Sequence, residues 1–398
     1  MIVKNYYIRS LAVILFLILF GSLTCCASTI PETNLENQID PNLNPNTIDF
    51  IPDSAHVKHL GRSIFKNDQL VMAYSSTGVE FNVKAKRLDV TIEGDNSATG
   101  TDNGNAARVV AFVNGERKLD KMILSKSQSF IIFNSEEISE GEVRIIKVSE
   151  ATSSIAAISK ITVDEDGTIS PTNPRNLKIE FIGDSITCGY GVDDLVKEHH
   201  FKTSTEDNSK TYAYKTAQNL NADYSMVCAS GWGIISGYSG NGTKQEAQQL
   251  PLFYDKLAVG WSSIASVSPK NTDWDFSSFV PDFIVVNLGT NDASYTKGAS
   301  KKVAEYKDAY IDFLKDIRAK NPQAYIICSL GIMGQDLYPA IETAVSEYKA
   351  ATGDEKVCPL KFANQSMGDG IAADWHPSEK THAKAAALLT AKIKELTN

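Results

Sequence analysis

The hydrophobic pattern of this chain changes at residues 171–175 (PTNPR), and this change restricts the fold more than any other feature. Before it, short runs alternate apolar and polar residues, as at residues 79–83 (VEFNV) and 88–92 (LDVTI). A period of two is typical of strands with one buried face. After it, apolar runs alternate with segments that have a helical period. A chain of 398 residues is also long for one core, so we expect two domains.

The first domain, residues 53–168, is expected to be a β-sandwich of jelly-roll type. Further strand-like runs occupy residues 107–113, 129–133, 143–148 and 158–163, and turn signals fall at residues 94–96, 114–115 and 140–141. About eight short strands at this spacing favour a sandwich.

The second domain, residues 176–398, is expected to be an α/β domain. Strands are predicted at residues 177–182, 224–229, 283–288, 325–330 and 357–361, and helices at 211–220, 299–320, 338–351 and 379–396. Such alternation implies a parallel sheet covered by helices on both faces. Reactive groups then gather at the carboxyl ends of the strands.

Residues 1–26 have the features of an export signal. Lys4 and Arg9 precede an apolar run at residues 11–20, which is shorter than the roughly 20 residues of a membrane span. The end of this segment, LTCC, resembles a lipobox, with Cys26 favoured over Cys25; the alternative is an ordinary cleaved signal. Residues 27–52, rich in Asn, Pro and Thr, are expected to be a linker. We therefore expect an exported protein, either lipid-anchored and facing the periplasm or cell surface, or secreted.

Composition excludes several kinds of partner. The net charge is -9 and no basic run is present, so nucleic acid is not an expected ligand. The remaining cysteines lack zinc-site spacing, and the acidic loop at residues 95–105 lacks the spacing of a calcium site. We expect no metal or other cofactor. Cys188, Cys228 and Cys328, which lie in or beside apolar strands, are expected in the core, and one or two disulfides are left open.

Three segments carry candidate chemistry, each at a strand end or ahead of a helix. Ser185 ends the first strand of the α/β domain, where a sharp turn exposes a serine hydroxyl; its alternative role is a helix N-cap. Residues 287–292 (NLGTND) supply an Asn amide that can donate to an oxyanion, or a simple turn residue. His376 precedes the last helix and is a candidate base for Ser185, or a solvent-facing turn residue. A serine at one strand end, an asparagine at another and a histidine in the last loop follow one another along the chain, and together they are expected to form one site.

The motifs GDSIT, GTND and DWHP resemble those of the SGNH (GDSL) hydrolase superfamily, over about residues 176–398. The longer segments GDSITCGYG and VNLGTND, with residues 274–276 (WDF), are similar to carbohydrate esterase family 2. That family joins an N-terminal jelly roll to an SGNH domain. The resemblance implies removal of acetyl groups from glycans, often at a primary hydroxyl, without a metal.

The resemblance also implies roles for individual residues. Ser185 would be the nucleophile and would donate its N–H to the oxyanion, together with Asn291 and the N–H of Gly233, with Gly231 as the other option. His376 would accept the Ser185 proton and return it to the sugar oxygen. The superfamily places its triad Asp three residues before the His, where this chain has Ala373. Either Asp374 orients His376, or a backbone carbonyl does so and leaves a Ser–His dyad.

Aromatic residues near these motifs are candidates for sugar binding. Trp232, Trp375 and Tyr190 are expected to offer flat faces to a pyranose ring, whereas Trp261 and Trp274 are expected in the core or at a rim. The alternatives to a glycan deacetylase are a general short-chain or aryl esterase and a non-catalytic glycan-binding surface lipoprotein. We expect the β-domain to shape the cleft rather than to bind glycan independently.

Overall fold

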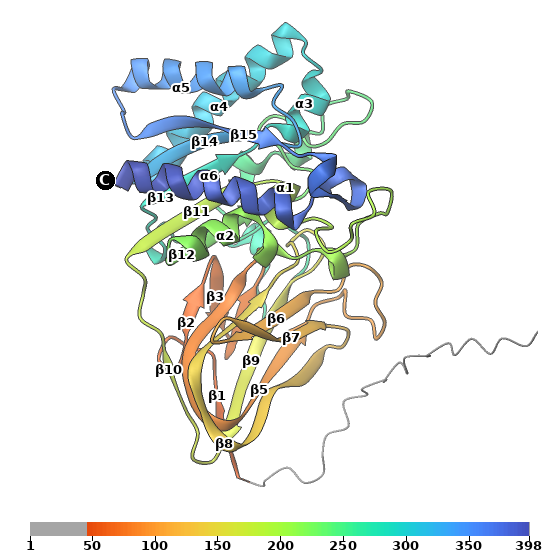
Figure 1. Ribbon diagram of the computed structural model, residues 1–398, viewed down its shortest axis with the longest axis vertical. Helices are drawn as coiled ribbons and strands as arrows, with labels where there is room; N and C mark the ends of the chain where they lie inside the picture. The colour runs from red at the N-terminus through yellow and green to blue at the C-terminus, as the bar shows by residue number, and fades with distance from the viewer. Residues whose placement is uncertain (1–45, 398) are drawn as a thin grey trace, which may run out of the picture. The chain divides into compact units, whose positions relative to one another are not determined.

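A computed structural model describes residues 46–397 of the chain (Figure 1). The expected export signal, Cys26 and most of the expected linker lie outside these residues. Within them, no helix is both long enough and apolar enough to cross a membrane.

The described residues form seventeen strands and six α-helices. The first ten strands are β1 (Thr47–Phe50), β2 (Lys58–Leu60), β3 (Ser63–Lys66), β4 (Gln69–Met72), β5 (Thr77–Gly94), β6 (Arg108–Val113), β7 (Glu116–Met122), β8 (Ser127–Lys147), β9 (Ala156–Asp164) and β10 (Thr168–Pro171). The other strands are β11 (Leu177–Gly183), β12 (Ala222–Cys228), β13 (Phe283–Asn287), β14 (Tyr325–Ile332), β15 (Val357–Asn364), β16 (Ile371–Ala372) and β17 (His376–Pro377). The helices are α1 (Ser185–Cys188), α2 (Tyr212–Asn219), α3 (Thr290–Thr296), α4 (Ser300–Lys320), α5 (Tyr338–Thr352) and α6 (Glu379–Thr397).

The first domain is all β, as predicted. Its strands follow the order β3-β4-β9-β5-β8-β6-β7, with β1 on β9 and both β2 and β10 on β5. Alternate residues of β5 are buried along its second half, and they contribute to one apolar core with β8 and β9. This is the period of two that the sequence showed.

Two predictions about this domain are wrong in detail. Residues 140–141 are not a turn, because β8 continues through them and Gly141 pairs with Val83 of β5. A side chain at Gly141 would collide with Asn114 Oδ1 at 2.2 Å, so this glycine permits close packing instead of a turn. Residues 47–50, expected in the linker, form β1 and pair with β9.

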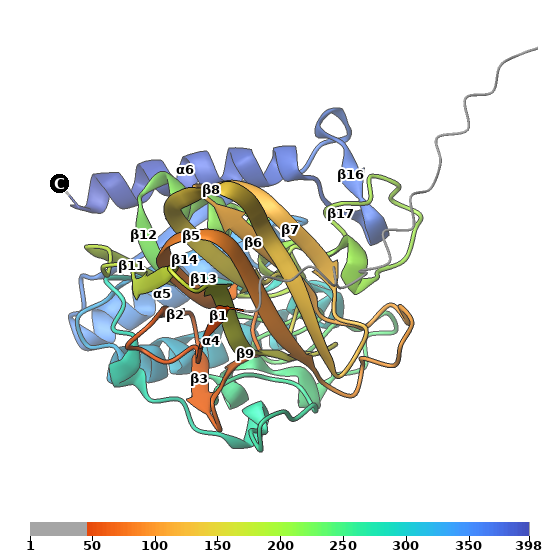
Figure 2. The ribbon, with the colours of Figure 1, turned by 90° about the horizontal axis from the view of Figure 1, so that it is seen from below.

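The second domain is built on a parallel sheet of five strands, in the order β12-β11-β13-β14-β15. Adjacent residues of β11 point to opposite faces. Phe181 joins the core under α2 and α6, and Ile182 joins the core under α4 and α5. Figure 2 shows α6 on one side of this sheet and α4 on the other. The predicted sheet with helices on both faces is confirmed.

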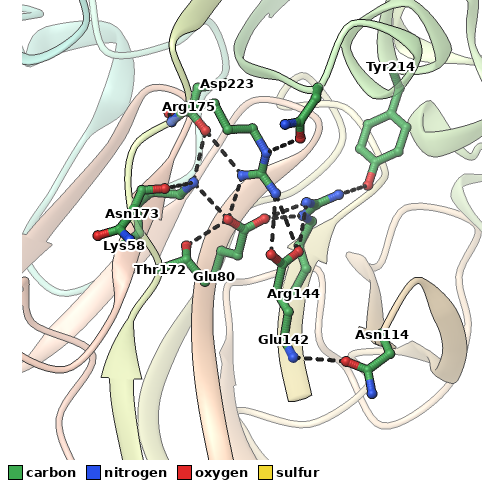
Figure 3. A network of polar contacts seen from close by, with 11 residues as sticks. Lys58, Glu80, Asn114, Glu142, Arg144, Thr172, Asn173, Arg175, Tyr214 and Asp223 are labelled. Atoms are coloured by element: carbon green, nitrogen blue, oxygen red, sulfur yellow. Dashed lines mark hydrogen bonds and ion pairs between the residues drawn. The ribbon is translucent and has the colours of Figure 1, made fainter.

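A buried ion network joins the two domains (Figure 3). Glu80 of β5 receives Lys58 Nζ at 2.7 Å, Arg144 Nε at 2.7 Å and Arg175 Nη1 at 2.6 Å. Burial by itself would raise the pKa of Glu80, but the three cations hold it well below its ordinary value. Arg175 also contacts Asp223 at the start of β12, so the network ties the β-sandwich to the edge of the parallel sheet.

Candidate active site

Ser185 lies where β11 turns abruptly into α1. Asp184 caps this short helix by accepting the N–H of Ile186 at 3.0 Å. A side chain at Gly183 would come within 2.0 Å of Thr187 Oγ1, so the turn is tight enough to require glycine. The turn leaves Ser185 at the carboxyl edge of the sheet, where it lines a cavity.

His376 is within hydrogen-bond distance of this serine. Its Nε2 is 2.9 Å from Ser185 Oγ. Its Nδ1 is 3.2 Å from the carbonyl oxygen of Ala373 and 3.1 Å from that of Asp374. Since a carbonyl can only accept, Nδ1 carries a proton, and Nε2 of the neutral ring is left to accept the serine proton.

The carboxylate of Asp374 does not face His376, contrary to the triad role we predicted. It accepts the hydroxyl of Tyr190 at 2.8 Å and the N–H of Phe201 at 2.9 Å, and it lies 2.9 Å from His200 Nδ1. Asp374 has a left-handed backbone, with φ of 48°, which turns the side chain away from the imidazole while its carbonyl points toward it. The alternative we kept open, orientation by backbone carbonyls, is the arrangement found.

Tyr190 supports the imidazole instead of offering a free face to a sugar. One face of its ring stacks on His376, with ring centres 4.0 Å apart, and it also stacks on Phe201 at 4.3 Å. Burial lowers the pKa of His376 to about 4, although the two carbonyls act in the opposite direction. His376 is therefore neutral near pH 7, the form that a general base requires.

Asn291 lies in the first turn of α3, directly after the loop that follows β13. Its Nδ2 donates to the carbonyl of Trp232 at 2.7 Å and has a longer contact of 3.4 Å with Asp184. Asn291 lines the same cavity as Ser185 and His376. The structure thus brings together the three residues that the motifs singled out.

The N–H of Gly233 is not available to an oxyanion, so the donor role predicted for it is wrong. It donates to the carbonyl of Gln248 at 3.1 Å. A side chain at Gly233 would lie 2.5 Å from Asp292, so glycine is needed here for close packing. The other option, Gly231, lines the cavity, has φ of 81°, and its N–H has no acceptor among residues 46–397.

Asp292 organises the loop that carries these glycines. This buried carboxylate accepts the N–H groups of Ile234, Ile235 and Ser236 at 3.0, 2.8 and 3.1 Å. Burial raises its pKa to about 6, although the three donors act in the opposite direction. We did not predict this role, although Asp292 directly follows Asn291 in the GTND motif.

The cavity has a volume of about 680 Å³ and draws residues from both domains. The β-domain contributes Asn105, Glu150 and Ser153. Trp375, predicted to bind sugar, lies on its wall with 54% of its surface exposed.

Trp232, also predicted to bind sugar, does not line this cavity. It is only 9% exposed and packs edge-on against Phe253. It contributes to a neighbouring cavity of about 510 Å³ that also contains Trp261. Trp261 is 83% exposed, so it is a rim residue.

Glu150, Cys188 and Glu206 lie together beneath the site, with potential ligand atoms within 4.8 Å of one another. Burial raises the pKa of Glu206 and of the Cys188 thiol well above their ordinary values, which disfavours the charged forms that bind metals. The four cysteines in the described residues are all free thiols.

Family models match both domains. Residues 181–384 match the GDSL-like lipase/acylhydrolase family, and residues 59–172 match the carbohydrate esterase 2 N-terminal domain.

Individual relatives match most of the chain. The cellulase/esterase CelE of Acetivibrio thermocellus is 33% identical over 81% of this chain, which spans only 37% of that protein's length. An acetylxylan esterase / glucomannan deacetylase of Cellvibrio japonicus is 25% identical, covering 86% of this chain and 89% of its own. The structure of an acetyl xylan esterase (Est2A) from the rumen bacterium Butyrivibrio proteoclasticus superimposes with a TM-score of 0.79 at 28% identity, covering 88% of this chain and 99% of the other.

Proposed function

Because this chain belongs to the GDSL-like lipase/acylhydrolase family and carries the N-terminal domain of carbohydrate esterase family 2, we propose that it removes O-acetyl groups from polysaccharides or oligosaccharides. The observation that carries the proposal is the 2.9 Å contact between Ser185 Oγ and His376 Nε2, beside Asn291 in an open cavity. A nucleophile, a neutral base and an amide donor in one cavity are the parts that acyl transfer requires.

The first half of the reaction forms an acetyl-enzyme. His376 Nε2 takes the proton of Ser185 as Oγ attacks the acetyl carbonyl carbon. The oxyanion is stabilised by the N–H groups of Ser185 and Gly231 and by the second N–H of the Asn291 amide, the one not bonded to the Trp232 carbonyl. His376 then gives the proton to the departing sugar oxygen, and the deacetylated glycan leaves.

The second half releases acetate. His376 takes a proton from water, and the resulting hydroxide equivalent attacks the acetyl-enzyme through the same oxyanion contacts. Collapse of this intermediate breaks the bond to Ser185 Oγ, which regains its proton from His376. The backbone carbonyls of Ala373 and Asp374 keep the Nδ1 proton in place throughout, because both accept from it, so that only Nε2 gains and loses a proton.

The choice of a carbohydrate substrate is supported by the cavity and by the relatives. Trp375 presents an exposed aromatic face beside His376, which suits packing against a pyranose ring. Relatives that cover most of this chain are named for action on acetylated xylan and glucomannan. We therefore place acetylated xylan and acetylated mannan first among substrates.

Acetate release by residues 27–398 tests this proposal. Acetylated mannan, acetylated xylan and 4-nitrophenyl acetate are compared, with Ser185→Ala as control. Fast release from a glycan that disappears in the variant supports the deacetylase. Hydrolysis of the aryl ester alone favours a general esterase, and no Ser185-dependent release from any substrate contradicts the proposal and favours a glycan-binding protein.

We propose in addition that the protein is exported and anchored through lipid on Cys26. The support is the sequence of residues 1–26, with its short apolar run and its LTCC ending. Metabolic labelling with radioactive palmitate in a bacterial host tests this. Label that is lost in Cys26→Ala and kept in Cys25→Ala supports it, and unlabelled protein in the medium indicates a cleaved signal.

A further inference from the structure

Glu150 of the β-domain is buried against the hydrolase domain, in the loop between β8 and β9. Lys147 Nζ holds this loop by donating to the carbonyls of Ala73, Ser149 and Glu150 at 3.0, 2.6 and 3.1 Å. The N–H of Glu150 donates to Glu206 Oε2 at 2.8 Å. The backbone of Glu150 is therefore held from both domains.

The side chain of Glu150 reaches the loop that follows β12. Its Oε2 accepts the N–H of Ser230 at 2.7 Å, and the Cys188 thiol lies 3.7 Å from the same oxygen. Ser230 directly precedes Gly231, which lines the site and whose N–H has no acceptor within the described chain. The carboxylate thus holds one N–H of this loop while leaving the next one free.

We infer that Glu150 is a positioning residue for the oxyanion hole, supplied by the β-domain to the active site of the hydrolase domain. The inference rests on the proposed ester hydrolysis. Holding the Ser230 N–H fixes the orientation of its peptide plane and so limits rotation of the next one, whose N–H belongs to Gly231, a residue that lines the same cavity as Ser185. Without Glu150, the partly buried Ser230 N–H would lack its acceptor, and the loop would rotate to find another.

Three variants separate positioning from packing. Glu150→Leu fills a similar volume without an acceptor, Glu150→Gln keeps an acceptor oxygen, and Glu80→Gln alters a different buried carboxylate between the domains, away from the site. Two rates are measured for each: hydrolysis of 4-nitrophenyl acetate, and phosphonylation of Ser185 by a fluorophosphonate, followed by mass spectrometry. Both reactions place an oxygen in the oxyanion hole, and neither depends on the natural substrate, but the second ends once Ser185 is modified and needs no later hydrolysis step.

In Glu150→Leu we expect kcat to fall at least about tenfold with KM little changed, short of the 10²–10³-fold loss typical of deleting a donor. Phosphonylation slows in parallel. Glu150→Gln keeps most of both rates, and Glu80→Gln lowers Tm while keeping both within about twofold.

Two results overturn the inference. One is unchanged kcat and phosphonylation in Glu150→Leu. The other is equal loss of both rates in Glu150→Leu and Glu80→Gln, which indicates general weakening of the domain contact. If the wild-type protein hydrolyses no ester in a Ser185-dependent way, the proposed function fails, and the phosphonylation rates still decide the role of Glu150. If Glu150→Leu does not fold, Glu150→Ala takes its place in both assays.

Discussion

The two sides of Ser185 are built by different means. On the base side, His376 is held by two backbone carbonyls and the stacked ring of Tyr190, all within the hydrolase domain. On the oxyanion side, buried carboxylates hold the loop that follows β12. Asp292 accepts three N–H groups of this loop, and Glu150, which belongs to the β-domain, accepts a fourth. A carboxylate on the imidazole would raise its pKa, whereas one behind an N–H group only fixes a direction. The contacts on the base side therefore keep the His376 imidazole neutral, and those on the oxyanion side fix the directions of N–H groups.

The largest effect is expected on the base side. His376→Ala removes the general base and should lower kcat by about 10⁴-fold or more, since removal of either member of such a pair is severe. Steady-state hydrolysis of 4-nitrophenyl acetate measures it. His199→Ala, an exposed histidine paired with Asp194, is the matched control and should retain activity. A loss in His376→Ala no larger than in His199→Ala would remove His376 from the mechanism.

The oxyanion side should show a smaller loss. Asn291→Ala removes one donor and should lower kcat about 10²–10³-fold, or about 2.7–4 kcal/mol of transition-state stabilisation. Asn291→Asp should fare no better, because an ionised carboxylate cannot donate. Asn241→Ala, on an exposed loop, serves as control. Near wild-type kcat in Asn291→Ala would show that backbone N–H groups suffice.

The neutrality of the base side can be read from a pH profile. Because burial lowers the pKa of His376 to about 4, the acidic limb of kcat/KM should lie near pH 4. At pH 5 this leaves about thirtyfold more neutral imidazole than a pKa of 6.5 would. Between pH 6.5 and about pH 4, the unfolded state binds more protons at His376 than the folded state does. The contribution of His376 to the free energy of unfolding is therefore present above about pH 6.5 and is lost as the pH falls toward 4. A kinetic limb near pH 6.5 would contradict this environment.

The smallest effect is expected at Asp374. Asp374→Asn keeps the backbone carbonyl on His376 and an oxygen for the Tyr190 hydroxyl, so kcat should fall less than about tenfold. A triad aspartate changed to asparagine loses about 10⁴-fold. A loss of that size here would mean that the carboxylate reaches the imidazole during turnover.

The sequence predicted what depends on local patterns. The two domains, the parallel sheet and the positions of Ser185, Asn291 and His376 at strand ends or loops follow from periodicity and motifs. The orientation of Asp374 depends on a left-handed backbone, which no sequence pattern predicted. The choice between Gly231 and Gly233 depends on which N–H is already bonded to Gln248.

Glu150 illustrates the remaining limit of sequence reasoning. It meets Ser230 across 80 residues of chain and belongs to no motif, so only the packing of one domain on the other reveals it. By contrast, a signal for Asp292 was present, because it stands next to Asn291 in the GTND motif.

The ion network around Glu80 determines how this chain can be reused in chimaeric proteins. A gene segment that encodes residues 176–398 alone keeps Ser185, Asn291 and His376, but it discards Glu80 together with Arg175 and leaves Asp223 without its cationic neighbours. It also uncovers the apolar surface that the sandwich protects. Fusion to another scaffold therefore has to transfer both domains as a single cassette, and circular permutation or shuffling has to spare the boundary at residues 171–175.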